Sequence, residues 1–128
     1  MTLFIIEGDK MTKNKESTRY ASSLQENYIA KVLGGKVCCN SGAGKWSKSD
    51  VRIDEASLSV ECKTSMSPKS SFSIKKEWIT KQKEEAFANR LSNTAIAISF
   101  EPEGKENYFL INERLMKFLV EKLEEIDT

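Results

Sequence analysis

The stretch DVRIDEASLSVECK, residues 50–63, decides the fold prediction because hydrophobic and polar residues alternate along most of it. Side chains of a β-strand point alternately to its two faces, so this pattern is typical of strands with one buried face. The alternation breaks once, around Glu55 and Ala56. The stretch therefore predicts two antiparallel strands joined by a turn at these two residues.

A turn at this position also sets which residues of the hairpin lie opposite each other. Val51 would lie opposite Val60 and Asp50 opposite Glu61, with Lys63 on the same face as Glu61. Directly opposed residues have Cβ atoms ~4.5–5.5 Å apart. Glu-Ala is a poor two-residue turn because neither residue favours positive φ. A longer loop would keep the two carboxylates near one another, though not in this register.

Two opposed carboxylates repel each other unless a positive charge lies between them. A hard divalent cation fits this position, because Mg²⁺ is commonly held by one or two carboxylates together with waters and substrate phosphates. Lys63 would then be available to position a water or to offset charge on a phosphate. The alternative is the solvated face of a surface hairpin, since charged residues alternate on many half-exposed strands.

Composition restricts the possible classes of protein. A chain of 128 residues with 39% hydrophobic and 30% charged residues predicts one globular domain. We expect no membrane span and no signal peptide, and hence a cytoplasmic protein. The chain has no histidine, and its three cysteines have no metal-ligand spacing. These absences argue against a zinc hydrolase, a Ser-His-Asp triad and a Cys-His nucleophile.

Positive charge is concentrated on both sides of the hairpin. Residues 10–52 contain nine Lys/Arg and three acidic residues, and residues 63–90 contain seven and three, whereas residues 91–128 contain four and eight. Clustered basic residues on a nearly neutral chain are typical of a protein that binds a phosphate backbone. Solvated surface lysines are the alternative explanation.

The remaining pattern predicts helices and strands around the hairpin. Residues 9–17 are polar, and residues 1–16 are expected to form a flexible N-terminal segment. We predict helices from about residue 17 to the Gly34-Gly35 pair, over 73–91 and over 112–126, and strands at 36–40, 93–100 and 108–111. This α-β-β-β-α-β-β-α order predicts an α/β fold in which helices flank a small mixed central sheet.

Asp50 followed by Glu61-Cys62-Lys63 resembles the signature of the PD-(D/E)xK nucleases, with Ser49 in place of the proline. The wider pattern is similar to archaeal and phage Holliday-junction resolvases of that superfamily, which add a glutamate in the first helix and a Ser-Gly-x-Gly loop. Here these are Glu26 and Ser41-Gly42-Ala43-Gly44. The motifs cover about residues 17–65, and the element order extends the resemblance to about residue 100.

The resemblance implies a restriction endonuclease-like core, Mg²⁺ or Mn²⁺ as cofactor, a homodimer and branched DNA as substrate. Asp50, Glu61 and the Cys62 carbonyl would be metal ligands, Glu26 would act through water, and Lys63 would orient the attacking water. Such resolvases often carry an arginine beside the first-helix glutamate and another before the Ser-Gly loop. This chain has Asn27 and Asn40 at those positions, which bears on junction specificity.

Further residues are candidates for DNA contact or for the core. The candidates for DNA contact are Ser41, Lys45, Lys48, Lys75, Lys76 and Gln82, although some of these lysines could be solvent charges. We expect Trp78 and Cys62 in the core. Trp46 could stack on an unpaired base or pack in a dimer interface, together with the strand YFLI and the final helix.

The function expected from the sequence is a structure-specific endodeoxyribonuclease that resolves Holliday junctions. One alternative is a repair or nicking nuclease without junction preference. Another is a non-catalytic DNA-binding module that keeps the fold and uses only the lysines. Intact acidic residues argue against that module, since acids facing phosphate contribute nothing to binding.

Overall fold

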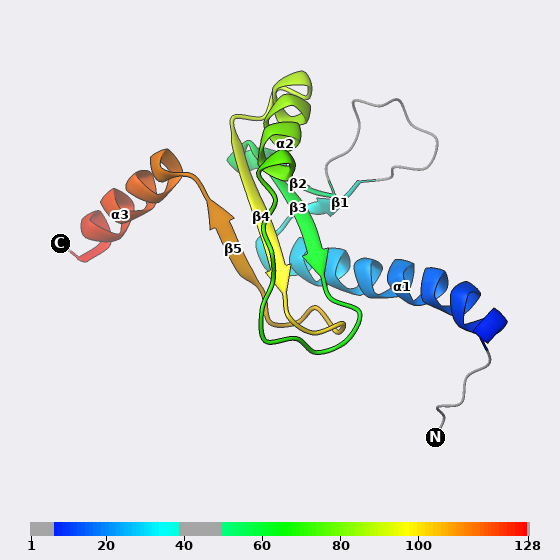
Figure 1. Ribbon diagram of the computed structural model, residues 1–128. Coiled ribbons are helices and arrows are strands. Elements are labelled where there is room, and N and C mark those ends of the chain that lie inside the picture. Colours follow the sequence, from blue (N-terminus) through cyan, green and yellow to red (C-terminus); the bar gives the residue numbers. More distant parts are fainter. Residues whose placement is uncertain (1–6, 39–49, 128) are drawn as a thin grey trace.

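The computed structural model describes residues 7–38 and 50–127 (Figure 1). The order of helices and strands is the one that the sequence predicts. The elements are α1 (Glu7–Leu33), β1 (Lys36–Val37), β2 (Val51–Ile53), the short 3₁₀ helix η1 (Asp54–Ala56), β3 (Leu58–Thr64), α2 (Lys76–Ala88), β4 (Asn93–Ser99), β5 (Tyr108–Ile111) and α3 (Glu113–Asp127).

Three predicted helix boundaries are wrong. The first helix begins at Glu7 rather than near Ser17, so residues 7–16 are helical. The flexibility expected of the N-terminal segment stays a prediction. Helix α2 begins at Lys76 instead of residue 73, and it ends at Ala88 instead of residue 91. Its early end has a local cause, because Asn89 turns out of helical geometry and Arg90 adopts a positive φ of 62°.

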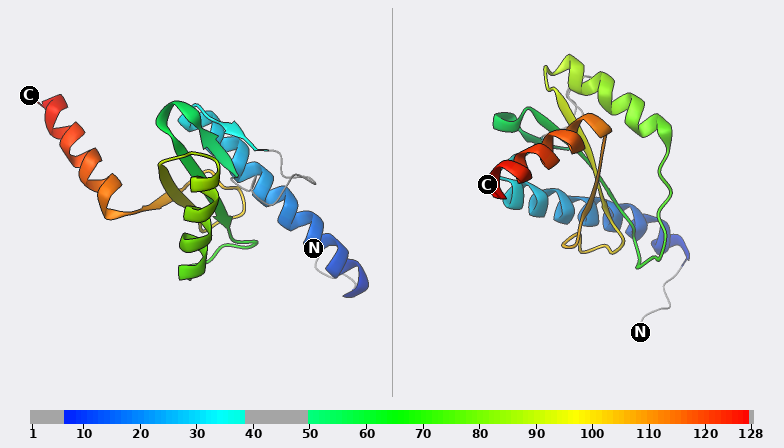
Figure 2. Two further views of the ribbon diagram at one scale, coloured as in Figure 1. Left: turned by 90° about the horizontal axis from the view of Figure 1, so that it is seen from above. Right: turned by 90° about the vertical axis from the view of Figure 1, so that its left-hand side faces the viewer.

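The five strands form one mixed sheet in the order β1-β2-β3-β4-β5. Strands β3 and β4 are parallel, and the other neighbours are antiparallel. A parallel pair needs a crossover connection, which α2 provides. Helix α1 packs on one face of the sheet and α2 on the other (Figures 1 and 2). The protein is therefore a mixed α/β structure with helices flanking a five-stranded sheet.

The predicted hairpin register is confirmed, although the predicted turn is wrong. Val51 pairs with Val60, and Ile53 pairs with Leu58. The turn is longer than two residues: η1 is followed by Ser57 with a φ of 51°. This four-residue loop has the same centre as the predicted turn, so the pairing is unchanged.

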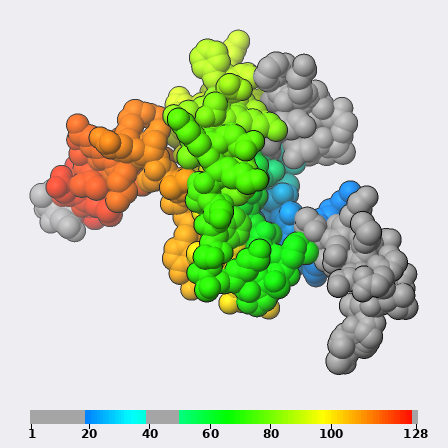
Figure 3. Space-filling model, in the orientation of Figure 1, coloured from blue at the N-terminus to red at the C-terminus, as the bar shows by residue number. Residues whose placement is uncertain are grey.

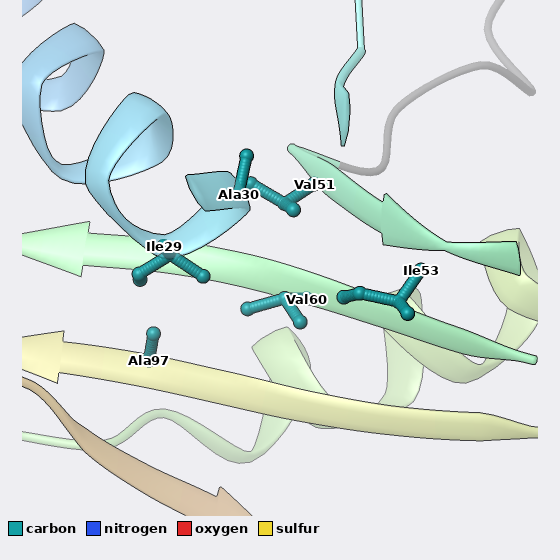
Figure 4. Packing of buried hydrophobic residues seen from close by; sticks show 6 residues of the cluster. All are labelled: Ile29, Ala30, Val51, Ile53, Val60 and Ala97. Carbon is teal, nitrogen blue, oxygen red and sulfur yellow. The ribbon is translucent and has the colours of Figure 1, made fainter. Parts of the chain in front are cut away.

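The core lies between α1 and the sheet (Figure 4). It consists of Ile29 and Ala30 from the helix and Val51, Ile53, Val60 and Ala97 from three strands. Cys62 packs against this cluster, as expected. Burial of the isoleucine and valine side chains of this set contributes roughly 1.5–3 kcal/mol each to folding.

Two buried glutamines fasten the helices to the parallel strand pair from opposite faces. Gln25 of α1 lies with its amide nitrogen 3.1 Å from the Lys63 carbonyl and 3.3 Å from the Ala97 carbonyl. Gln82 of α2 donates to the carbonyls of Ser59 and Ala95, at 3.1 and 2.9 Å. Because each amide bonds to β3 and to β4, both helices are held in register with the sheet.

The predicted glycine cap of the first helix is confirmed. Gly34 has a φ of 72°, and the Gly35 N–H donates to the Ala30 carbonyl at 2.8 Å, as in a Schellman motif. Within the described part of the chain, no helix has the length and apolar character needed to cross a bilayer.

Gly104 and Gly34 offer a matched test of packing. Both have positive φ, 66° and 72°, but a Cβ on Gly104 would lie 2.7 Å from Gln25 Cα, whereas one on Gly34 meets nothing within 4 Å. Gly34→Ala should lower the free energy of unfolding by about 1–2 kcal/mol through backbone strain. Gly104→Ala should lower it by about 1–3 kcal/mol more, because α1 must move. Chemical denaturation measures both, and equal losses would contradict the described packing of this loop on α1.

Candidate active site

Asp50 is held against the middle of the sheet by a hydrogen bond to the neighbouring strand. It lies directly before β2, and its Oδ2 accepts the N–H of Cys62 at 2.8 Å. Its own carbonyl accepts the N–H of Cys38 at 3.0 Å, which ties it to β1 as well. The sequence predicts that Asp50 lies near Glu61, and the structure brings them together through this contact, one residue outside the paired strand.

The N–H and C=O groups of one strand residue point to the same edge of the strand. Since the Cys62 N–H is directed to the Asp50 carboxylate, the Cys62 carbonyl lies on the same side. Its side chain projects from the face of the sheet that α1 covers and packs against the core. The predicted combination of Asp50 with the Cys62 backbone is therefore compatible with the structure.

A cavity of about 380 Å³ opens between this part of the sheet and α2. Asp50, Glu61 and Lys63 line one side of it. The other side is formed by Glu77, Trp78, Lys81, Gln82 and Glu85, which all lie on one face of α2. Two acids and a lysine of the sheet thus face a cavity with mixed charge on its helical wall.

Lys63 is held between a carboxylate and an aromatic ring. Its Nζ lies 3.7 Å from Glu61 Oε2 and 4.3 Å from the centroid of the Trp78 ring. The side chains of Lys63 and Glu61 are only 27% and 24% exposed, so the pair is screened less than a surface ion pair. Trp78 is thus not the core residue that the sequence predicts, because its half-buried ring lines the cavity and packs on the lysine.

The carboxylates of the site crowd one another electrostatically. Burial, followed by the charge of Asp50, raises the pKa of Glu61 to about 7. Burial also raises the pKa of Asp50, while the Cys62 N–H and Lys63 counteract this rise in part. Glu85 adds repulsion to both groups. One lysine therefore does not neutralise the site.

Glu26 belongs to the electrostatic surroundings of the site without lining the cavity. It is half-buried on α1, and burial followed by the charge of Asp50 raises its pKa to about 7. The predicted association of Glu26 with Asp50 therefore has support. A role through an intervening water stays a prediction.

These residues fit a divalent cation only in an open site. Among residues 7–38 and 50–127, no three His, Cys, Asp or Glu side chains gather closely enough to hold an ion by themselves. Asp50 and Glu61 supply two hard oxygen ligands whose repulsion a cation would relieve, and the Cys62 carbonyl lies on the same edge. Mg²⁺ keeps several waters and needs few protein ligands, so the donor set suits it and does not suit zinc.

Some predicted DNA contacts have other positions or roles. Gln82 is 4% exposed, and its amide nitrogen is committed to two strand carbonyls, so this nitrogen has a structural role. Since the residue also lines the cavity, its contact with DNA stays a prediction. Lys75 and Lys76 are exposed at the start of α2, outside the cavity lining. Ser41, Lys45, Lys48 and Trp46 lie outside the described residues.

Sequence reasoning named Gln82 of α2 as a site candidate but missed the contributions of Trp78 and Glu85. Trp78, Lys81 and Glu85 line the cavity at spacings of three and four residues, which place side chains on one side of a helix. This periodicity was a usable signal. It did not show which face of the helix would meet the strand carrying Glu61.

The raised pKa of Glu61 predicts that its ionisation destabilises the metal-free protein. The unfolded carboxyl ionises near its ordinary value of 4.5 and the folded one only near 7, so ionisation favours unfolding across that interval. Glu61→Gln in a chelating buffer should leave the free energy of unfolding almost unchanged at pH 4 and raise it at pH 8, by at most about 3 kcal/mol.

Asp54→Asn is the control, because the pKa of Asp54 is shifted in the direction opposite to that of Glu61. The hydrogen bond from Lys36 lowers the pKa of Asp54, so its contribution to stability is present at neutral pH and is lost as pH falls. This variant should be destabilised at pH 8 rather than stabilised. Denaturation at both pH values tests the pair, and a Glu61→Gln variant less stable than the wild type at pH 8 would refute the described crowding.

Comparison with protein-family models, with curated proteins and with solved structures found no match to this chain.

Proposed function

We propose that this protein is a metal-dependent endonuclease that hydrolyses phosphodiesters of DNA, with the restriction endonuclease-like core that its motif resembles. The observation that carries the proposal is the Asp50 carboxylate bonded to the Cys62 N–H at 2.8 Å, beside Glu61 and Lys63 on the wall of one cavity. Two carboxylates in mutual repulsion, with a lysine beside them, suit a reaction in which a cation and a phosphate enter together.

Each residue of the chain has a separate task in this proposal. Asp50, Glu61 and the Cys62 carbonyl would hold Mg²⁺, which supplies Lewis-acid polarisation of the phosphate when bound. Lys63 orients the attacking water or donates to a phosphate oxygen, and Trp78 keeps its ammonium group in place. Glu26, with its pKa raised to about 7, can exchange a proton with a water at the edge of the site near neutral pH.

The charge distribution supports DNA as the substrate. The cavity walls carry acids, so a phosphate is attracted by the surrounding basic residues rather than by the cavity itself. Lys81 of α2 lines the cavity, and the exposed Lys75 and Lys76 lie at the start of the same helix. Residues of this kind bind the backbone in a manner that weakens as salt rises.

The substrate class we favour is the four-way junction, because the spacing of Glu26, Asp50, Glu61 and Lys63 resembles that of junction resolvases. A repair or nicking nuclease would use the same residues without preference for branched DNA. A binding module without catalysis would gain nothing from carboxylates that face phosphate.

Cleavage of labelled duplex, flap and four-way junction DNA tests this function. The wild type should introduce paired symmetric nicks into the junction in Mg²⁺ or Mn²⁺ and should cut nothing in chelator. Asp50→Asn should still bind the junction but cut it at least ~10³-fold more slowly, because the metal position is lost. Glu55→Gln, an exposed change in the turn of the same hairpin, is the control and should cut normally. Wild-type cleavage by Asp50→Asn would refute the site, and equal cutting of duplex and junction would refute the junction preference alone.

Lys63→Ala should lower the single-turnover cleavage rate by more than ~10²-fold with little change in DNA affinity, since a positioned charge acts in the transition state. Lys81→Ala is the matched control, because it removes a second lysine of the same cavity, whose charge also lowers the pKa of Glu61, but leaves the Lys63–Glu61 ion pair in place. Its rate should fall less than tenfold. A parallel loss of affinity and rate in Lys63→Ala would instead identify Lys63 as a phosphate anchor.

A further inference from the structure

Helix α3 extends away from the sheet instead of packing on it (Figures 1 and 2). Asn112 is the single residue between β5 and α3, and its Oδ1 accepts the N–H of Leu115 at 2.9 Å as an N-cap. Arg114 donates to the Ser92 carbonyl and to Asn93 Oδ1, at 3.0 and 3.1 Å. These bonds fix the direction in which the helix leaves the body.

The projecting helix exposes most of its apolar side chains. The exposed set is Met116, Phe118, Leu119, Val120, Leu123 and Ile126, with exposed fractions from 41% to 77%. Together they present on the order of 600 Å², at or above the largest apolar patch of a typical monomer. Isolated helices of this length are marginal in water, so α3 needs a surface that covers this stripe.

A groove of about 700 Å³ runs beside the helix and could receive such a stripe. Its floor is the part of the sheet face that α1 leaves open, including Ala95, Phe109 and Ile111. Its other wall is the first half of α3, with Leu115, Phe118 and Leu119. No element among the described residues fills the groove, and Figure 3 shows α3 as an arm beside the body.

We propose that a second copy of this chain occupies the groove, and that the two copies exchange their α3 helices. In this two-fold dimer the α3 of each copy lies antiparallel to the α3 of the other and covers the sheet of the other. A symmetric interface of this kind closes on itself, because the same patch serves both copies.

The area supports a second copy as the occupant. Each copy contributes the stripe on α3 and the groove floor, and the β5 residues Tyr108, Phe109 and Leu110 extend this surface with exposed fractions of 56%, 42% and 38%. The sum approaches the ≈ 800 Å² per partner of a standard stable interface. One copy cannot satisfy both surfaces itself, since the N-cap and Arg114 hold its helix away from its own sheet.

The charges along α3 favour the antiparallel orientation. Residues 113–118 contain two basic residues and one acidic residue, and residues 119–127 contain one basic and four acidic residues. The net charges are therefore +1 and −3. Antiparallel helices set the positive half of each beside the negative half of the other, whereas parallel helices would set the two acidic halves together.

Sedimentation velocity of the full chain without DNA or metal tests the proposal, so the result is independent of the proposed function. We expect dimers with a Kd at or below about 10 µM. Leu123→Glu on the helix and Phe109→Glu on the groove floor should each raise the Kd at least ~30-fold, because each inserts a charge into an apolar contact. Phe87→Glu, which makes the same chemical change at an 86% exposed site on α2, should leave the Kd within twofold.

Circular dichroism and a thermal melt confirm that each variant folds. A wild type that remains monomeric at 100 µM would overturn the proposal, whether another protein or another segment of the chain covers the groove. A Leu123→Glu variant that dimerises as tightly as the wild type would show that α3 is not part of the interface. A Phe109→Glu variant that does so would show that α3 does not enter the groove of the other copy. A loss in Phe87→Glu equal to that in the other two would move the interface to α2.

Discussion

The hydrogen bond from the Cys62 N–H to Asp50 Oδ2 is the constraint on which the proposed site depends. Asp50 lies outside the paired residues of β2, so the strand ladder alone does not hold its carboxylate. The bond directs that carboxylate to the strand that carries Glu61 and Lys63, at 2.8 Å. If the hairpin slipped by one residue, Glu61 would turn to the opposite face of the sheet and the site would be lost. The buried Val51–Val60 pair and the two glutamine contacts resist this slip.

The acidic groups of the site lower the stability of the protein in the absence of a cation, and contacts in other parts of the fold offset this loss. Burial and repulsion raise the pKa of Glu61 and of Glu26 to about 7, which means that ionising either group is less favourable in the folded protein than in the unfolded chain. Gln25 and Gln82 bind carbonyls of β3 and β4 from both faces of the sheet, next to the crowded acids. Rigid support of this kind holds acidic groups in place before a ligand arrives. A cation and a phosphate backbone would relieve the repulsion together.

The sequence predicted the order of elements, the hairpin register and the Gly34 cap because these depend on local periodicity and on backbone conformation. It did not predict the turn geometry at Ser57. This residue adopts a left-handed conformation, and the usual sequence signal for that conformation, a glycine, is absent from the turn. The sequence placed Trp78 in the core and did not predict the bonds from Gln82 to the strand carbonyls, since the facing of α2 depends on packing against β3 and β4. The projection of α3 was also not predictable. The amphipathic pattern of a helix indicates that its apolar face is covered, but it does not indicate which surface covers that face.

The central claim is that Asp50 and Glu61 form one cation site, and direct ion binding tests it most closely. Mn²⁺ can be titrated into the full chain, with and without a phosphorothioate junction that resists cleavage, while electron paramagnetic resonance measures the free ion. We expect saturable Mn²⁺ binding that tightens with the junction and is lost in Glu61→Gln but kept in Glu55→Gln. Mn²⁺ binding of wild-type affinity and stoichiometry in Glu61→Gln would contradict it.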